Sequence, residues 1–308
     1  MRATLESLAK MSVPPDLEWE LIVVDNNCSD GSRGVIEDFA RTSGLSVRYV
    51  FEARQGVAHA LNTGVPMARG EMIAFTNDDV IIHPKWLASI KATFEEFNCM
   101  GVEGRIIATW EHGPKPSWAE TKGPRRMPGV FPSFDLGEEA KLTSTTPWGA
   151  NMAFRKAAFE KYGLFRTDLG PVGYKKKMVG VDREFGRRLV EGGEKIAYAP
   201  GAIVYHPVPP ENLTKSYALS HYFHYGKSQV LVEGWPKGAI CYFGVPRYMF
   251  RALLENFFKW ITALDRRARF YYKLQCYRVA GSIATARKLS KSKRDAPQRR
   301  NSAPGGSL

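Results

Sequence analysis

A regular alternation of apolar runs and helical patterns, beginning at Glu20, constrains the fold more than any other feature of the sequence. Each apolar run has the length of a buried strand and is followed by a stretch with helical periodicity. The runs span residues 21–24, 47–51 and 72–76, and the helical stretches span 33–43, 57–68 and 84–96. Parallel strands need a crossover, usually a helix, so this order predicts an α/β domain with a mostly parallel sheet flanked by helices.

The same domain is expected to continue to residue 233, with one long insertion. Residues 111–147 are rich in Gly, Pro and charged side chains and lack periodicity, which is typical of a functional loop. The remaining predicted elements of the domain are a strand at 100–110, a helix at 182–192 and strands at 195–199 and 202–205.

The net charge of +13 lies entirely in the C-terminal quarter of the chain. Residues 234–308 hold 16 Lys or Arg and 3 Asp or Glu, whereas the 28 basic and 28 acidic residues of 1–233 cancel. Such an excess of basic residues favours binding to nucleic acid or to an anionic membrane. Residues 234–290 form a basic, aromatic-rich amphipathic pattern without a membrane-spanning apolar run, which favours binding at the membrane surface. Residues 291–308 are predicted to be a disordered tail.

The four cysteines, at positions 28, 99, 241 and 276, are too far apart in sequence for a zinc or redox motif and suggest no disulfide framework. The N-terminus predicts an amphipathic helix and lacks the charged segment and apolar run of a signal peptide. We therefore expect a cytoplasmic protein.

Two polar clusters follow predicted strands, at the edge of the sheet where open α/β domains bind ligands. Residues 25–32 begin with Asp25, whose carboxylate can either close a turn or hold a nucleobase or ribose hydroxyl. In the second cluster, Asn77-Asp78-Asp79, a polar turn is again the alternative. Two adjacent carboxylates repel each other, however, and a divalent cation offsets that repulsion, so this cluster favours a metal and phosphate site.

The chain carries three segments in this order: Ile22-Val23-Val24-Asp25-Asn26, Phe75-Thr76-Asn77-Asp78-Asp79 and Gly180-Val181-Asp182. Their order resembles that in family 2 GT-A glycosyltransferases, and the resemblance covers about residues 1–230. The resemblance implies a Rossmann-like GT-A fold and an inverting, hexosyltransferase-like reaction. It also implies a nucleotide-sugar donor such as a UDP- or GDP-sugar, and Mn²⁺ or Mg²⁺ as the cofactor.

The resemblance further implies roles for single residues. Asp182 would be the catalytic base for the acceptor hydroxyl, and Asp79 and His206 would bind the metal. The residues expected at the donor are Asp25, Asn27, Arg54, Asn77 and Asp78, and those expected at the acceptor are Trp148, Gly149 and Asn151. Without the resemblance, the residues around Asp182 favour a helix N-cap, and a lone histidine at a strand end is more often structural than a ligand.

The sequence departs from the family pattern in three places. Asn77 and Val181 stand where the family usually has acids, which affects the expected contacts to the ribose and to the acceptor. Family members usually begin with a strand ahead of a helix like residues 2–8, and this sequence begins within that helix. We therefore expect a truncated or misassigned start, an empty strand position in the sheet and an incomplete wall at the donor site.

Two other functions remain open at this stage. A catalytically impaired protein of the same fold would bind a nucleotide sugar or dock on a membrane. A sugar hydrolase would use Asp79 and Asp182 as its acid and base. The order of the motifs favours a transferase of cell-envelope polysaccharide or glycolipid synthesis, acting on a lipid-linked or saccharide acceptor at the inner face of the cell membrane.

Overall fold

The computed structural model describes residues 1–119, 130–170 and 179–295. The chain divides into two compact units, Met1–His221 and Tyr222–Leu308. The division falls within helix α7 (Lys215–Glu233), ahead of the boundary predicted at residue 234. Part of the predicted loop, residues 120–129, and the end of the predicted tail, residues 296–308, lie outside the described residues.

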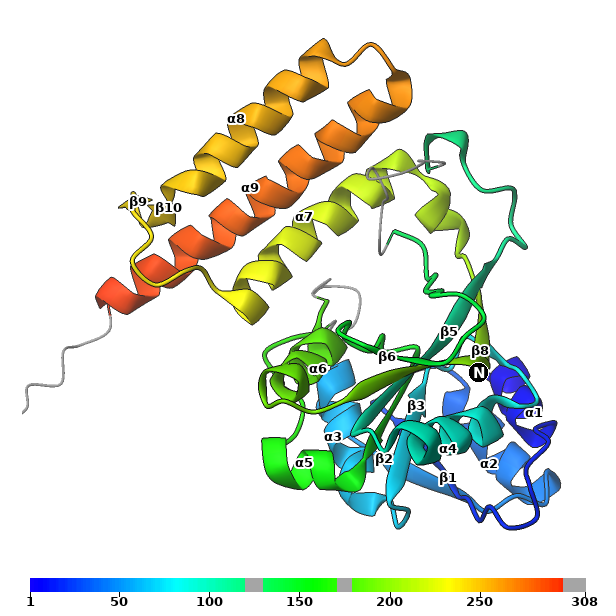
Figure 1. Cartoon of the computed structure of the whole chain (residues 1–308). Coiled ribbons are helices and arrows are strands. Elements are labelled where there is room, and N and C mark those ends of the chain that lie inside the picture. Colours follow the sequence, from blue (N-terminus) through cyan, green and yellow to red (C-terminus); the bar gives the residue numbers. More distant parts are fainter. Residues whose placement is uncertain (120–129, 171–178, 296–308) are drawn as a thin grey trace, which may run out of the picture. The chain divides into compact units, whose positions relative to one another are not determined.

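The described part of the first unit contains two sheets, and most of their strands come from the predicted apolar runs (Figure 1). Strands β1 (Leu21–Asp25) and β2 (Val47–Phe51) form a parallel pair. The second sheet has the order β3-β7-β5-β8-β4, with β6 paired to β8. Its strands are β3 (Met72–Thr76), β4 (Ile81–Ile82), β5 (Gly101–Thr109), β6 (Lys141–Thr143), β7 (Asn151–Arg155) and β8 (Ile196–Pro207).

The strand directions follow from the pairing. β5 and β8 are parallel, and β7 lies antiparallel between β3 and β5, so β3, β5 and β8 run in one direction. The α/β class expected from the sequence is thus confirmed. Within the described part of the chain, β1 pairs only with β2 and β3 pairs only with β7, so no ladder of hydrogen bonds joins the two sheets.

Two apolar clusters pack helices of the first unit against these sheets. The larger cluster joins α4 to the second sheet through buried residues such as Phe94, Tyr198 and Val204. The smaller cluster joins two N-terminal helices to β1 and β2 through Leu5 and Ile36. The α-helices are α1 (Arg2–Ala9), α2 (Ser32–Thr42), α3 (Val57–Met67), α4 (Trp86–Phe97), α5 (Lys156–Tyr162) and α6 (Val181–Glu191), with 3₁₀ turns at Ser117–Ala119 and Pro210–Leu213.

Strand β8 is one continuous element, whereas the sequence predicts two strands, at 195–199 and 202–205. Its pairing with β5 shifts register, because Ala199 lies opposite Gly104 and Ile203 lies opposite Arg105. Residues 200–202 are therefore extra residues on the β8 side of this ladder. Pro200 has no N–H to donate, and such a bulge is where a strand accommodates proline, so the apparent interruption is a kink within the strand.

The second unit contains the rest of α7, a short hairpin of β9 (Cys241–Tyr242) and β10 (Val245–Pro246), and the long helices α8 (Arg247–Thr262) and α9 (Arg266–Asp295). Its core includes Met249, Val279 and Ala286. Helices α7 and α9 cross closely at Gly226, where a Cβ would lie 1.8 Å from the carbonyl oxygen of Arg278. Helix α9 continues to Asp295, past residue 291, where the predicted tail begins.

Candidate active site

The acidic turn Asn77-Asp78-Asp79 follows the C-terminal end of β3, and all three residues are exposed. Strand β4 starts two residues after Asp79 and pairs antiparallel with β8, with Ile81 opposite Tyr205. This short ladder brings the turn next to the end of β8. As a result, Asp79 Oδ1 lies 3.7 Å from Nε2 of His206. The structure thus brings together the two residues expected to bind a metal.

Helix α1 fixes the backbone of the acidic turn from the other side. The hydroxyl of Thr4 donates to the carbonyl oxygen of Asp78 at 2.7 Å, and the N–H of Ile82 donates to the hydroxyl of Ser7 at 2.9 Å. Both side chains are buried. The carboxylates of Asp78 and Asp79 therefore project from a turn whose backbone is held at both ends.

Asp25 lies at the end of β1 and is buried, 6 % exposed. Its carboxylate accepts the N–H of Cys28 at 2.9 Å and the hydroxyl of Tyr49 at 2.8 Å. Desolvation is the largest single influence and raises the pKa of Asp25, but these hydrogen bonds together hold the pKa below its usual value. Asp25 is therefore an oriented anion, as a contact to a donor nucleoside would require. Apart from its place in a strand, Tyr49 has no feature in the sequence that marks it as part of the site.

Asn27 and Arg54 lie in neighbouring loops that bind each other through backbone and side-chain contacts. The amide of Asn27 donates to the carbonyl oxygen of Ala53 at 3.2 Å, and Asn27 has a positive φ of 58°. Arg54 forms a two-pronged ion pair with Glu52, with N···O distances of 2.9 and 2.8 Å. Part of its charge is therefore compensated, while its side chain remains 69 % exposed. The predicted contacts of Asn27 and Arg54 to a donor stay predictions.

The segment Trp148-Gly149-Ala150-Asn151 connects the acidic turn to Asp182. On one side, the hydroxyl of Thr76, next to the acidic turn, donates to the carbonyl oxygen of Ala150 at 3.0 Å. On the other side, the N–H of Gly149 donates to Asp182 Oδ2 at 2.6 Å. The expected acceptor segment therefore lies between the expected metal ligands and the expected base.

Asp182 lies in the first turn of α6, where helix N-termini favour a negative charge. Its Oδ1 accepts a hydrogen bond from the backbone N–H of the next residue, Arg183, at 2.8 Å. Desolvation nevertheless dominates and raises the pKa of Asp182 above its usual value, with the N–H groups of Arg183 and Gly149 opposing it. A carboxylate with a raised pKa is a stronger base, which suits proton abstraction from a hydroxyl. The helix-cap interpretation alone does not account for this desolvation.

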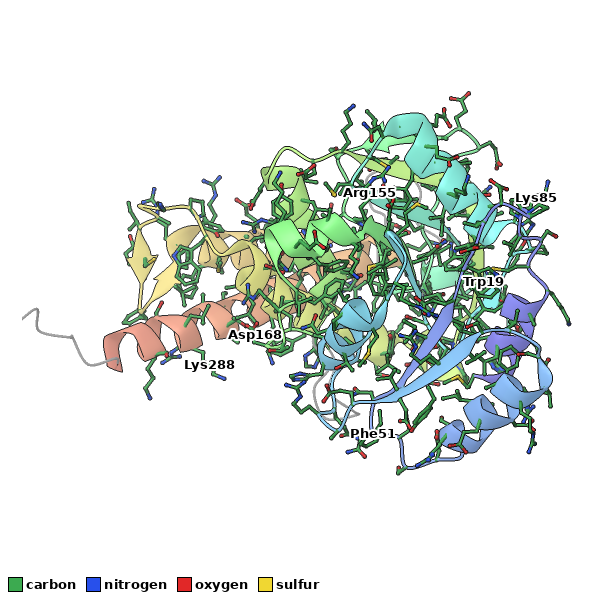
Figure 2. All side chains as sticks on the ribbon, turned by 90° about the horizontal axis from the view of Figure 1, so that it is seen from below. Trp19, Phe51, Lys85, Arg155, Asp168 and Lys288 are labelled. Atoms are coloured by element: carbon green, nitrogen blue, oxygen red, sulfur yellow. The ribbon has the colours of Figure 1, made fainter. Side chains whose placement is uncertain are left out.

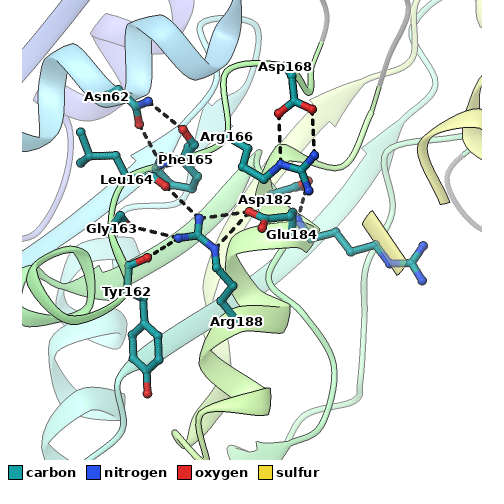
Figure 3. Close-up of polar contacts among 11 residues, drawn as sticks. Asn62, Tyr162, Gly163, Leu164, Phe165, Arg166, Asp168, Asp182, Glu184 and Arg188 are labelled. Atoms are coloured by element: carbon teal, nitrogen blue, oxygen red, sulfur yellow. Dashed lines mark hydrogen bonds and ion pairs between the residues drawn. The ribbon is translucent and has the colours of Figure 1, made fainter. Parts of the chain in front are cut away.

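Helix α6 is held in place by contacts on two sides. Arg188 donates to the carbonyl oxygens of Tyr162 and Leu164 and to the carboxylate of Glu184, so it ties α6 to the loop after α5 (Figure 3). Toward the acceptor segment, α6 presents Gly186, where a Cβ would lie 2.9 Å from Cδ of Pro147. Only glycine permits this approach, which sets the position of Asp182.

Asn151, which was expected at the acceptor, lies in the interior of the first unit. It is buried, 1 % exposed, and its Oδ1 accepts the indole N–H of Trp86 at 2.7 Å. Both hydrogens of its amide are donated, to the carbonyl oxygens of Arg105 at 2.9 Å and Ala202 at 2.8 Å. These contacts join α4, β5 and β8, so Asn151 positions the acceptor segment, and its amide has no hydrogen left for an acceptor.

Trp148 is partly buried and packs against Phe134, with ring centroids 5.9 Å apart. Gly149 is also partly buried, and a Cβ there would approach Asp182 Oδ2 to 3.3 Å. Gly149 therefore suits the close contact with the carboxylate that the structure shows.

The donor set at Asp79 and His206 fits one divalent cation that is shared with a substrate. Nδ1 of His206 lies 3.2 Å from the carbonyl oxygen of Pro207, which can only accept, so this nitrogen carries the hydrogen in the neutral ring. Nε2 then presents its lone pair toward Asp79, an arrangement common among histidine ligands. Among the described residues, no group of three or more His, Cys, Asp or Glu side chains is placed to hold a metal alone. The remaining ligands would have to come from phosphate oxygens and water.

Comparisons with known proteins confirm the family expected from the sequence. The model of the family "Glycosyl transferase family 2" matches residues 1–163. The succinoglycan biosynthesis protein ExoM of Rhizobium meliloti is 27 % identical over 227 residues, which cover 73 % of this chain and 68 % of ExoM. The glycosyltransferase AglE of Haloferax volcanii is 24 % identical over 220 residues, which cover 71 % of this chain and 65 % of AglE. Part of each relative thus lies outside the match.

The fold is also similar to that of a solved structure, the mannosyltransferase PcManGT from Pyrobaculum calidifontis in complex with GDP-Man and Mn²⁺. The TM-score is 0.59 at 17 % sequence identity, and the match covers 92 % of this chain and 81 % of that one. At this identity the likeness supports the fold alone. Since the family model covers more than half of the sequence, the chain belongs to glycosyl transferase family 2.

Proposed function

We propose that this protein is an inverting, metal-dependent glycosyltransferase that moves a sugar from a nucleoside-diphosphate donor to an acceptor hydroxyl. One observation carries the proposal: Asp182, with its raised pKa, is hydrogen-bonded to Gly149 in a segment that also contacts the end of β3, where Asp78 and Asp79 project. A base and an acidic metal-binding turn are thereby connected through one short stretch of backbone.

The roles of the residues follow from this geometry. Asp79 and His206 would hold a Mn²⁺ or Mg²⁺ ion, which supplies positive charge to the diphosphate leaving group when it is bound. Asp182 accepts the proton of the acceptor hydroxyl as its oxygen bonds to the anomeric carbon from the face opposite the diphosphate. The bond between the anomeric carbon and the diphosphate oxygen breaks in the same step, so the configuration inverts. Asp25, Asn77 and Asp78 would contact the nucleoside and ribose.

The acceptor and location are inferred from the relatives. ExoM is named for succinoglycan biosynthesis, and PcManGT is described with GDP-Man, so a UDP- or GDP-sugar donor and a lipid-linked or saccharide acceptor fit this chain. The excess basic charge of residues 234–308 favours binding to the anionic lipids of the cytoplasmic face of a membrane. We therefore place the protein in cell-envelope polysaccharide or glycolipid synthesis.

The test separates donor binding from transfer. Thermal shift with a panel of nucleotide sugars and Mn²⁺ should identify a donor that raises the unfolding temperature. With that donor and a saccharide acceptor, Asp182→Asn should bind the donor as the wild type does and transfer about 100-fold more slowly, the effect of losing a general base. Asp16→Asn, which changes an exposed carboxylate outside the site, is the matched control and should keep wild-type rates.

Three results would contradict the proposal. The first is wild-type transfer by Asp182→Asn. The second is release of free sugar alone, without a glycosylated acceptor, which would favour a hydrolase. The third is an Asp79→Ala variant with unchanged response to Mn²⁺ and donor.

A further inference from the structure

Helix α8 has an exposed apolar stripe that the core of the second unit does not use. Leu254, Phe257, Phe258 and Ile261 recur at the spacing of one helical face, and Leu264 follows in the turn before α9. Their exposed fractions are large, reaching 64 % for Phe258 and 99 % for Leu264. These five residues, named here the α8 stripe, form a continuous apolar surface near the end of the helix.

The neighbouring face of α8 is already packed, so the α8 stripe is additional to the core. Met249 is buried, and Phe250, Ala252 and Leu253 pack with it against residues such as Val279 and Ile283 of α9. The two helices lie side by side along their length (Figure 1). A helix that only completes this hairpin needs one apolar face. The second apolar face therefore requires another explanation.

Basic side chains surround the α8 stripe. Residues 247–273 contain seven Lys or Arg and two Asp or Glu. Of the two acids, Glu255 pairs with Arg251 at 2.7 Å, and Asp265 accepts the N–H of Ala268 at 2.8 Å as the cap of α9. Exposed Arg266 and Arg269 follow the stripe, and α9 carries more basic side chains, among them Lys288 (Figure 2).

We propose that the α8 stripe inserts into the interface of an anionic lipid bilayer. An apolar face rich in Phe and Leu, bordered by Arg and Lys, is the pattern of helices that lie in the headgroup region. A protein partner would satisfy the apolar residues but not the one-sided charge, which anionic headgroups neutralise. No helix in the described part of the chain is long and apolar enough to cross a bilayer, so this surface docks on the membrane instead of spanning it.

The α8 stripe would bind the membrane at which the proposed transferase acts, so this inference rests on the proposed function. The two are nevertheless tested separately, because vesicle binding is measured without donor or acceptor. Loss of transfer would leave vesicle binding in place, and failure to bind vesicles would leave transfer to a soluble acceptor in place.

The experiment is cosedimentation of the full chain with two kinds of vesicle, one of phosphatidylcholine alone and one of phosphatidylcholine mixed with phosphatidylglycerol. The wild type should bind the mixed vesicles and lose binding as salt is raised. Phe258→Glu and Leu264→Glu should each weaken binding by about tenfold or more, since each removes one inserted side chain. Arg266→Gln with Arg269→Gln should weaken binding to mixed vesicles and reduce its dependence on salt.

The matched control is Leu142→Glu, which alters an exposed leucine of the first unit, 48 % exposed, and should bind as the wild type does. Circular dichroism and unfolding temperatures check that each variant is folded. Equal binding of the wild type to both vesicles, or wild-type binding by Phe258→Glu, overturns the proposal. A lipid-free dimer that Phe258→Glu converts to a monomer would also overturn it, because the α8 stripe would then join two copies of the chain.

Discussion

Replacing Asn151 by alanine gives the clearest test of how the site is built. The side chain serves three partners, the indole N–H of Trp86 and the carbonyl oxygens of Arg105 and Ala202, at 2.7, 2.9 and 2.8 Å. With alanine at this position, these three groups, which lie in or near the interior, lose their hydrogen-bond partner. A buried polar group that loses its hydrogen bond costs about 1 to 3 kcal/mol, so the loss of unfolding free energy should be about 3 kcal/mol or more.

For a unit of this size, 3 kcal/mol corresponds to a fall in Tm of about 6 to 12 °C. The assay is urea and thermal unfolding followed by far-UV circular dichroism. Trp86→Phe removes the donor together with the pyrrole ring that carries it, and combining it with Asn151→Ala should cost about 1 kcal/mol less than the sum of the two single variants. This coupling assigns part of the loss to the bond between Trp86 and Asn151.

The opposite pattern would refute the reasoning. If Asn151 contacts the acceptor, Asn151→Ala keeps wild-type stability within about 0.5 kcal/mol, as surface substitutions do, and raises the acceptor KM. A large loss of stability, with the remaining folded enzyme showing a normal acceptor KM, supports the positioning role.

Three further predictions concern other parts of the site. Gly186→Ala places a Cβ 2.9 Å from Pro147 and should cost about 1 to 3 kcal/mol and slow transfer while donor binding is kept, as unfolding and thermal-shift measurements would show. Glu103 is fully buried and desolvation raises its pKa, so the fold binds its proton more tightly than the unfolded chain does, and stability is lost as pH rises through the folded-state pKa. The unfolding free energy of Glu103→Gln, measured by urea titration, should therefore rise relative to that of the wild type as the pH is raised from 4 to 8. A difference between the two proteins that stays the same over this range would contradict the prediction. His206→Ala should raise the Mn²⁺ concentration for half-maximal transfer by about tenfold or more, whereas an unchanged requirement would exclude His206 as a ligand.

Local patterns were sufficient to predict much of the first unit. The strands at 47–51 and 72–76 have their predicted bounds, because each is a short run of β-forming side chains between turn residues. The class of the fold followed from their alternation with helices. Strand β8 was predicted as two strands because Pro200 and Gly201 usually end a strand, and the sequence does not reveal that three extra residues bulge from the ladder with β5.

The candidate site was predictable in its residue types but not in its contacts. Asp79 approaches His206 because of β4, a strand of two residues that no periodicity can indicate. Asn151 has the same neighbours in sequence whether it binds an acceptor or not, since its partners Trp86, Arg105 and Ala202 lie far away along the chain. A polar side chain that forms hydrogen bonds within the protein can be distinguished from one that binds a ligand only when its partners are known.

The interruption between β1 and β3 has a consequence for how a ligand is held. β1 ends at Asp25 and β3 ends at the acidic turn, and among the strands that the structure describes no backbone ladder fixes the distance between these ends. That distance depends on side-chain packing and on the two hydrogen bonds that α1 makes at and after the acidic turn, and such contacts adjust more readily than hydrogen-bonded strands do. A donor whose nucleoside reaches Asp25 and whose diphosphate reaches Asp79 would act as the cross-link that the backbone does not supply, so that binding would stiffen the enzyme as well as fill the site.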